Sequence, residues 1–147
     1  MTQEYKDLLL RYLCMVLPYG VILHFDDKVG QEDEPLYGFR ENGGKLQIND
    51  AYFIEEVKPY LRPMSSMTEE EAKEISILYG IKDILSTKIT DKYIEVVVDD
   101  NFSSTEKRTI WYNEIVSSIE ILDWLNVHHF DYLNLIEKGL AIEITEK

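Results

Sequence analysis

Apolar residues recur at helical spacing near the start of the chain and predict an amphipathic helix over residues 3–17. Pro18 and Gly20 follow at once, and both residue types commonly end helices. Cys14 falls in this apolar segment, and we expect it to be a small buried side chain. The first part of the chain is therefore predicted to be helical with one buried face.

Runs rich in β-branched and aromatic residues predict strands further along. They occupy residues 21–25, 36–41, 45–49, 93–98 and 108–112, and residues 140–144 are a candidate edge strand. Between two of these runs stands Asn42-Gly43-Gly44, and Asn-Gly is a strong hairpin signal because both turn residues must accept positive φ. The run 108–112 is expected to pair back onto 93–98.

The stretch 58–71, KPYLRPMSSMTEEE, combines two prolines with the strongest helix-start signal in the sequence. Pro59 and Pro63 predict an extended segment, since each disfavours helical backbone at the preceding residue. Ser66 and Thr68 each begin a capping box, in which a hydroxyl and a glutamate three residues later satisfy amides reciprocally. A helix is expected to follow.

That helix is predicted to bury Ala72, Ile75 and Leu78 on one face and to end before Gly80. Ser117 to Glu120 repeats the capping-box form and predicts another helix with Leu122 and Leu125 inward. Two short elements are also expected: a helical turn within residues 51–57, capped by Asp50, and a short helix from Asp131 to Gly139.

The central stretch has two interpretations. In the first, the stretch presents a rigid surface to a protein partner, formed by Tyr60, Arg62 and Met64, since Tyr and Arg anchor many interfaces. The simpler interpretation is a stiff connector that places Tyr60, Leu61 and Met64 in the core, because buried methionine and proline-stiffened connectors are common. Both interpretations make the stretch central to the fold.

Helices and strands are mixed without a regular βαβ rhythm, which indicates the α+β class. We expect a single domain over residues 1–147, with a mostly antiparallel sheet of about five strands and two or three main helices. A chain of 147 residues buries a substantial core.

The net charge of the chain limits the classes of molecule that it is expected to bind. The chain has 28 acidic and 15 basic residues and a formal net charge of −13, so it repels phosphate backbones and direct nucleic-acid binding is not expected. An acidic protein associates faster with a basic partner. The single cysteine excludes an internal disulfide, and neither a signal peptide nor a membrane span is visible. We expect a cytoplasmic protein that does not bind membranes.

The pair His128-His129 with Asp131 is the most conspicuous candidate for chemistry, because imidazole and carboxylate ligate zinc or iron. A metal-dependent hydrolase using these residues, with His24 joining from a distant strand, is one alternative. Adjacent residues point about 100° apart on a helix, so the spacing disfavours shared coordination. At a helix end, histidines instead complement the open carbonyls.

Other catalytic patterns are weak. Asp26-Asp27 and Asp99-Asp100 follow strands and can gather carboxylates for a divalent ion, but acids are also ordinary turn residues. Phosphate-binding glycine loops and a serine-nucleophile motif are absent from the sequence. We therefore assign no cofactor and no catalytic residue, and we favour a protein that is not an enzyme.

Three segments carry a resemblance to a family. KPYLRPMSSMTEEE, LPYGV at 17–21 and DWLNVHHFDYLNLIEKGLAIE at 123–143 resemble a group of small uncharacterised proteins of gut Bacteroides-type bacteria and their prophages. The resemblance implies a bacterial cytoplasmic setting and a mobile-element origin, with no activity and no site residues. The expected function is a non-enzymatic accessory protein that binds another protein. A further alternative is an acidic mimic of nucleic acid that inhibits a nucleic-acid-binding protein.

Overall fold

The computed structural model describes residues 1–25, 32–49, 52–100 and 104–144. Helices and strands are mixed, and the strand pairing is mostly antiparallel, so the α+β class is confirmed. The strands form sheets of four, two and three strands in the described residues rather than one sheet of about five. Asp26-Asp27 and the proposed Asp50 cap lie outside the described residues.

Contacts divide the chain into two compact units. Unit 1 comprises residues 1–62 and 134–147, and unit 2 comprises residues 63–133. The expectation of a single domain over 1–147 stays a prediction, because compactness does not tell whether the units unfold together.

Unit 1 begins with helix α1, Gln3–Val16. Thr2 caps it by accepting a hydrogen bond from the amide of Tyr5 at 3.1 Å. The buried face carries Leu9, Tyr12, Leu13 and Val16. Cys14 is exposed, so the expectation of a buried thiol was wrong; the residue is about 100° around the helix from Leu13 and leaves the apolar face.

The sheet of unit 1 has the strand order β2-β1-β5-β9. The strands are β1 Ile22–Phe25, β2 Glu34–Pro35, β5 Val57–Leu61 and β9 Ile142–Glu143. Pairing is antiparallel except between β5 and β9, which are parallel. The predicted C-terminal edge strand is therefore present, shorter than expected.

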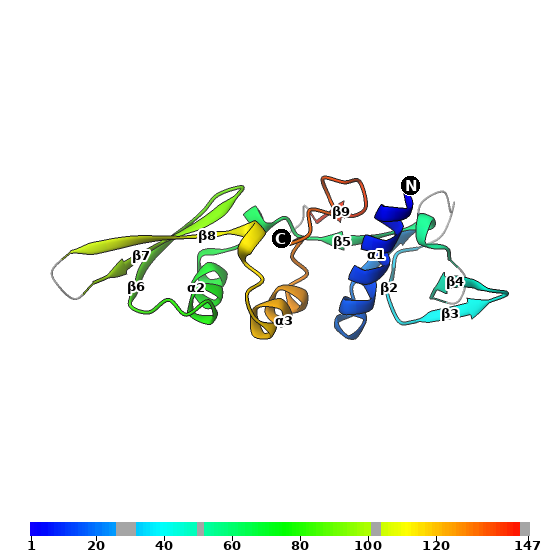
Figure 1. The fold of residues 1–147 in the computed structure, drawn as a ribbon, viewed down its shortest axis with the longest axis horizontal. Coiled ribbons are helices and arrows are strands. Elements are labelled where there is room, and N and C mark those ends of the chain that lie inside the picture. Colours follow the sequence, from blue (N-terminus) through cyan, green and yellow to red (C-terminus); the bar gives the residue numbers. More distant parts are fainter. Residues whose placement is uncertain (26–31, 50–51, 101–103, 145–147) are drawn as a thin grey trace. The chain divides into compact units, whose positions relative to one another are not determined.

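A hairpin of β3, Phe39–Asn42, and β4, Lys45–Ile48, forms the second sheet of unit 1 (Figure 1). Gly43 and Gly44 form its turn with φ of 62° and 81°, as the sequence predicted. The 3₁₀ helix η2, Ile54–Glu56, follows within the segment where a helical turn was expected. Another 3₁₀ turn, η1, occupies Leu17–Tyr19 after α1.

Asn49 anchors the segment between the two sheets of unit 1. Its side chain is 2% exposed, and its Oδ1 accepts hydrogen bonds from the amides of Tyr37 at 2.8 Å and Gly38 at 3.3 Å. Its Nδ2 donates to the carbonyl of Pro35 at 2.9 Å and to Glu34 at 3.2 Å. The backbone is left-handed, with φ of 49°, which asparagine tolerates better than most residues.

Unit 2 packs helices α2 and α3 with a three-stranded antiparallel sheet (Figure 1). The elements are η3 Met64–Ser66, α2 Glu69–Leu78, β6 Ile84–Ile89, β7 Tyr93–Asp99, β8 Thr105–Trp111, η4 Tyr112–Glu114 and α3 Ile119–Val127. Alternate residues of β7, namely Ile94, Val96 and Val98, are buried, and they join a core with residues of both helices. The predicted return of 108–112 onto 93–98 is confirmed.

The helix cap and the terminal glycine predicted for α2 are both present. Thr68, the second of the two proposed caps, accepts from the amide of Glu71, whose carboxylate accepts in turn from the amide of Thr68. Gly80 follows the helix with φ of 101°. Leu78, however, is 40% exposed, and Ser76 faces the core with Ala72, because a step of four residues keeps a helical face better than a step of six.

The second predicted capping box forms differently. Ser118, not Ser117, caps α3 by accepting from the amide of Ile121 at 3.2 Å. Residues 131–139 form turns instead of the expected short helix, and Asn134 has φ of 57°. In the parts of the chain that the structure describes, no helix has the length and apolar character to cross a membrane.

Candidate functional site

Three polar side chains of unit 1 converge on one face of its larger sheet. The hydroxyl of Tyr60 donates to Oδ2 of Asp33 at 2.9 Å, and Nδ1 of His24 lies 3.1 Å from Oδ1 of the same carboxylate. The Tyr60 hydroxyl is also 3.4 Å from Nδ1 of His24, and the two rings meet edge to face at 6.0 Å. We call these residues the Asp33–His24–Tyr60 cluster.

The alternation of side chains along β1 and β5 determines the face of the sheet on which the cluster lies. Leu23 of β1 and Pro59 of β5 are register partners and are both buried, so His24 and Tyr60 point to the opposite face. His24 pairs with Lys58, and Tyr60 lies two residues further along β5, on the same face. Asp33 immediately precedes β2, the strand that pairs with β1 on its other side.

Protonation in the cluster follows from its geometry. Burial, followed by the adjacent Asp33 carboxylate, raises the pKa of Tyr60 above its ordinary value of 10.0. Tyr60 is therefore a hydrogen-bond donor at neutral pH. A carboxylate at Nδ1 of His24 favours the tautomer in which Nδ1 carries the proton.

The cluster is open to water, which limits its energetic value. The side chains of His24 and Asp33 are 38% and 42% exposed. A pair this exposed is worth roughly 1 kcal/mol or less because solvent screens it. Its main effect is to hold the Tyr60 ring and the imidazole in fixed orientations, which suits recognition.

The other proposed partner-binding residues lie in different environments. Arg62 is half-buried and ends the first segment of unit 1. Met64 is 7% exposed and belongs to the core of unit 2, so its side chain is not offered at the surface. Leu61 is fully buried, as the connector interpretation expects, whereas Tyr60 is only partly buried. A partner-binding role for Tyr60 and Arg62 stays a prediction.

The histidine pair does not share a ligand set. His128 follows α3 as its C-cap, with its ring 4.3 Å from the Trp124 ring and its Nδ1 3.5 Å from Glu71. His129 has left-handed backbone with φ of 60°, and Asp131 is 5% exposed. Among the described residues, no group of three or more His, Cys, Asp or Glu side chains is arranged to hold a metal ion.

The remaining strand-end acids have a structural setting. Asp100 follows β7 and accepts a hydrogen bond from the hydroxyl of Ser104, which immediately precedes β8. Asp99 is the last residue of β7 and the register partner of Thr105. The Asp26-Asp27 pair is outside the described residues.

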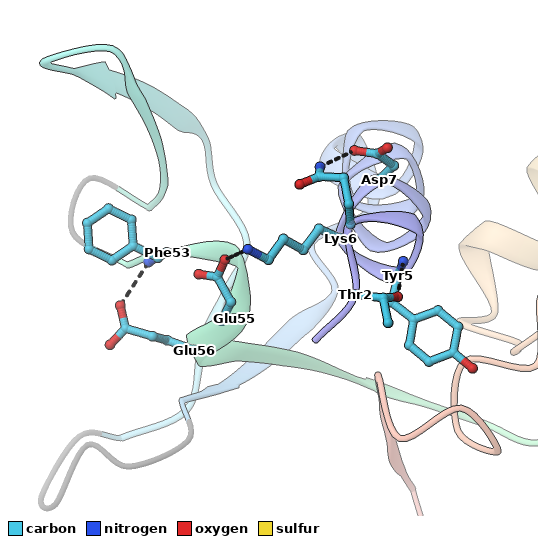
Figure 2. A network of polar contacts seen from close by, with 8 residues as sticks. Thr2, Tyr5, Lys6, Asp7, Phe53, Glu55 and Glu56 are labelled. Atoms are coloured by element: carbon cyan, nitrogen blue, oxygen red, sulfur yellow. Dashed lines mark hydrogen bonds and ion pairs between the residues drawn. The ribbon is translucent and has the colours of Figure 1, made fainter.

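A second polar network joins α1 to η2 in unit 1 (Figure 2). Lys6 extends from α1 and its ammonium lies 2.7 Å from the carboxylate of Glu55. The hydrogen bond from Lys6, and after it the backbone of Glu55 itself, lowers the pKa of Glu55. Beside it the amide of Phe53 donates to Glu56 at 3.0 Å.

Sequence reasoning missed Asp33 and the Lys6–Glu55 pair. Asp33 stands in an acid-rich loop in which every carboxylate looks alike, and only the register of β1 with its neighbours selects it. Lys6 and Glu55 are far apart in sequence. The helical face that carries Lys6 was identifiable, but nothing in the sequence indicated what it meets.

The geometry thus offers an oriented Tyr, His and Asp on a sheet face, together with a separate ion pair beside a helix. Comparison with known protein families, with curated proteins and with solved structures finds no match for this chain.

Proposed function

We propose that this chain is a non-enzymatic accessory protein of a prophage or similar mobile element, and that it binds another protein through the sheet face of unit 1 around Tyr60 and Arg62. The observation that supports the proposal is the Tyr60 side chain, which is partly exposed yet fixed by its hydrogen bond to Asp33. Tyr and Arg are enriched among residues that dominate interface energies.

Fixing Tyr60 in advance favours binding. An interface side chain that is already ordered loses less conformational entropy when a partner docks, and the saving is roughly 0.5–1.5 kcal/mol for each side chain. The edge-to-face contact with His24 adds a second constraint on the ring. The cluster therefore presents an amphipathic aromatic group in one orientation, as protein-binding surfaces do.

Net charge favours a basic partner. With a formal charge of −13, long-range attraction accelerates encounter with a positively charged protein, and added salt slows it. We expect the association rate constant to fall with ionic strength while the dissociation rate constant changes less.

The alternative function, an acidic mimic of nucleic acid, is not favoured by the charges on the sheet of unit 2. Acids and bases alternate on its sheet: Lys88 is the register partner of Glu95, and Lys107 lies 3.7 Å from Glu95. Arg108 lies 3.7 Å from Glu106 on the same strand. A mimic requires a continuous acidic stripe, and this sheet interleaves both signs.

The test is affinity capture from a lysate of a gut Bacteroides-type host, quantified by mass spectrometry, followed by binding measurements with the captured protein. Tyr60→Ala and Arg62→Ala are expected to lose the partner, with Kd rising at least about ten-fold for Tyr60→Ala. Tyr60→Phe keeps the ring but removes the donor to Asp33, so a smaller loss is expected.

Arg108→Ala removes an exposed arginine in unit 2 and serves as the matched control. Circular dichroism verifies that every variant is folded. The proposal fails if no protein is enriched over a blank matrix, or if folded Tyr60→Ala and Arg62→Ala bind as the wild type does.

A further inference from the structure

Unit 1 contains a hollow of about 620 Å³ that the Asp33–His24–Tyr60 cluster does not use. It lies between the first turns of α1, the tip of the β3–β4 hairpin and η2. Residues that line it include Lys6, Leu10, Lys45, Leu46, Phe53 and Glu55. The volume falls within the range of about 300–1,000 Å³ that is typical of small-molecule sites.

The walls of the hollow combine apolar and charged side chains. Leu46 and Phe53 are 41% and 37% exposed, and Leu10 and Ile54 add partly buried surface. A bound apolar group would cover these side chains, and each square ångström withdrawn from water contributes about 25 cal/mol. The hollow thus favours a ligand with an apolar body.

The polar side chains of the hollow differ in how they are engaged. The carboxylate of Glu55 is paired with Lys6 at 2.7 Å, and Oδ1 of Asp7 accepts from Nε2 of Gln3 at 2.9 Å (Figure 2). Among the described residues, both acidic side chains that line the hollow therefore already have a hydrogen-bond donor or an ammonium group beside them. The ammonium of Lys45 instead lies 5.8 Å from the centroid of the Phe53 ring.

Lys45 therefore places a positive charge directly beside the exposed apolar wall. A ligand anion there meets a cation held over an aromatic ring, while its apolar part contacts Leu46 and Phe53. Lys6 contributes to this preference, because its pairing with Glu55 offsets one of the negative charges of the wall.

We propose that this hollow binds a small organic carboxylate with an apolar body, its carboxylate at Lys45 and its body against Leu46 and Phe53. The site is separate from the surface proposed above for a protein partner. Binding of the carboxylate and binding of a protein can therefore succeed or fail independently.

The test is a titration of the ¹⁵N-labelled full chain with octanoate, and in parallel with octanol, which has the same apolar body and no charge. Octanoate is expected to shift the backbone amide resonances of Lys45, Leu46 and Phe53. It should bind about three-fold or more tightly than octanol, the preference that one solvent-screened charge pair can supply.

Lys45→Gln is expected to abolish the preference for octanoate and to leave octanol binding unchanged. Lys73→Gln makes the same change of net charge on α2 of unit 2 and should retain the preference. Phe53→Leu should weaken both ligands.

Three results would overturn the proposal. The first is the lack of any shift at the amides of the hollow. The second is equal weakening of octanoate and octanol by Lys45→Gln. The third is loss of the preference in Lys73→Gln, because the effect would then reflect net charge rather than a site.

Discussion

Replacing Asn49 by alanine should destabilise unit 1 more than any surface substitution in it. The side chain is 2% exposed, and it joins three backbone groups, the amides of Tyr37 and Gly38 and the carbonyl of Pro35. Alanine removes all three hydrogen bonds and leaves three part-buried backbone groups without this partner. It also has to adopt the left-handed backbone that asparagine tolerates.

The magnitude follows from these contacts. A neutral hydrogen bond contributes about 1 kcal/mol net, so the three bonds together account for about 3 kcal/mol. Left-handed backbone at alanine adds roughly 1 kcal/mol. We expect the free energy of unfolding to fall by about 3–5 kcal/mol, a large share of the roughly 5–15 kcal/mol that stabilises a typical domain.

Urea denaturation followed by circular dichroism measures the loss, and amide hydrogen exchange locates it. The amides of Tyr37 and Gly38 should exchange at least about a hundred-fold faster in Asn49→Ala, which corresponds to about 2.7 kcal/mol. Gln47→Ala, at a half-exposed position on β4, should cost less than about 0.5 kcal/mol. A loss below about 1 kcal/mol in Asn49→Ala, or unchanged exchange at the two amides, would refute the reasoning.

Three further predictions concern unit 2. Thr68→Ala should cost about 1 kcal/mol in urea denaturation, whereas Thr68→Ser, which keeps the capping oxygen, should be nearly neutral. Ile121→Ala should cost about 2–5 kcal/mol in the same assay, because the side chain is fully buried in the core; a loss under 1 kcal/mol would contradict that burial. Burial, and after it the charge of Asp91, raises the pKa of Tyr112 from 10.0 to about 12. The stability that comes from this raised Tyr112 pKa is therefore complete below pH 10 and lost as the pH rises through 12. An absorbance titration of the Tyr112→Phe variant should lack the phenol that ionises near pH 12.

Elements controlled by neighbouring residues could be predicted from the sequence. The cap of α2 depends on Thr68 and Glu71, three residues apart, and the hairpin turn depends on Gly43 and Gly44 alone. In both cases the backbone groups to be satisfied lie within a few residues of the side chains that satisfy them. Tertiary structure had little opportunity to override these signals.

Features that depend on register or rotation could not be predicted in this way. Strand β6, Ile84–Ile89, has no clear alternation and is defined by its pairing with β7, so the sequence left it unassigned. The contact of Asp33 with His24 and Tyr60 depends on how β2, β1 and β5 align. Asn49 looked like the end of a strand, although its side chain is the most heavily bonded polar group in that segment.

Unit 1 is assembled from two stretches of sequence, and unit 2 is the single stretch between them. As the ribosome releases the nascent chain, β5 emerges well before β9, its parallel neighbour. Unit 2 can complete its core during that interval. The edge of β5 that later pairs with β9 still has unsatisfied amides and carbonyls. Until β9 is translated, that edge is open to pairing with other chains, and shielding by a chaperone would be most useful then.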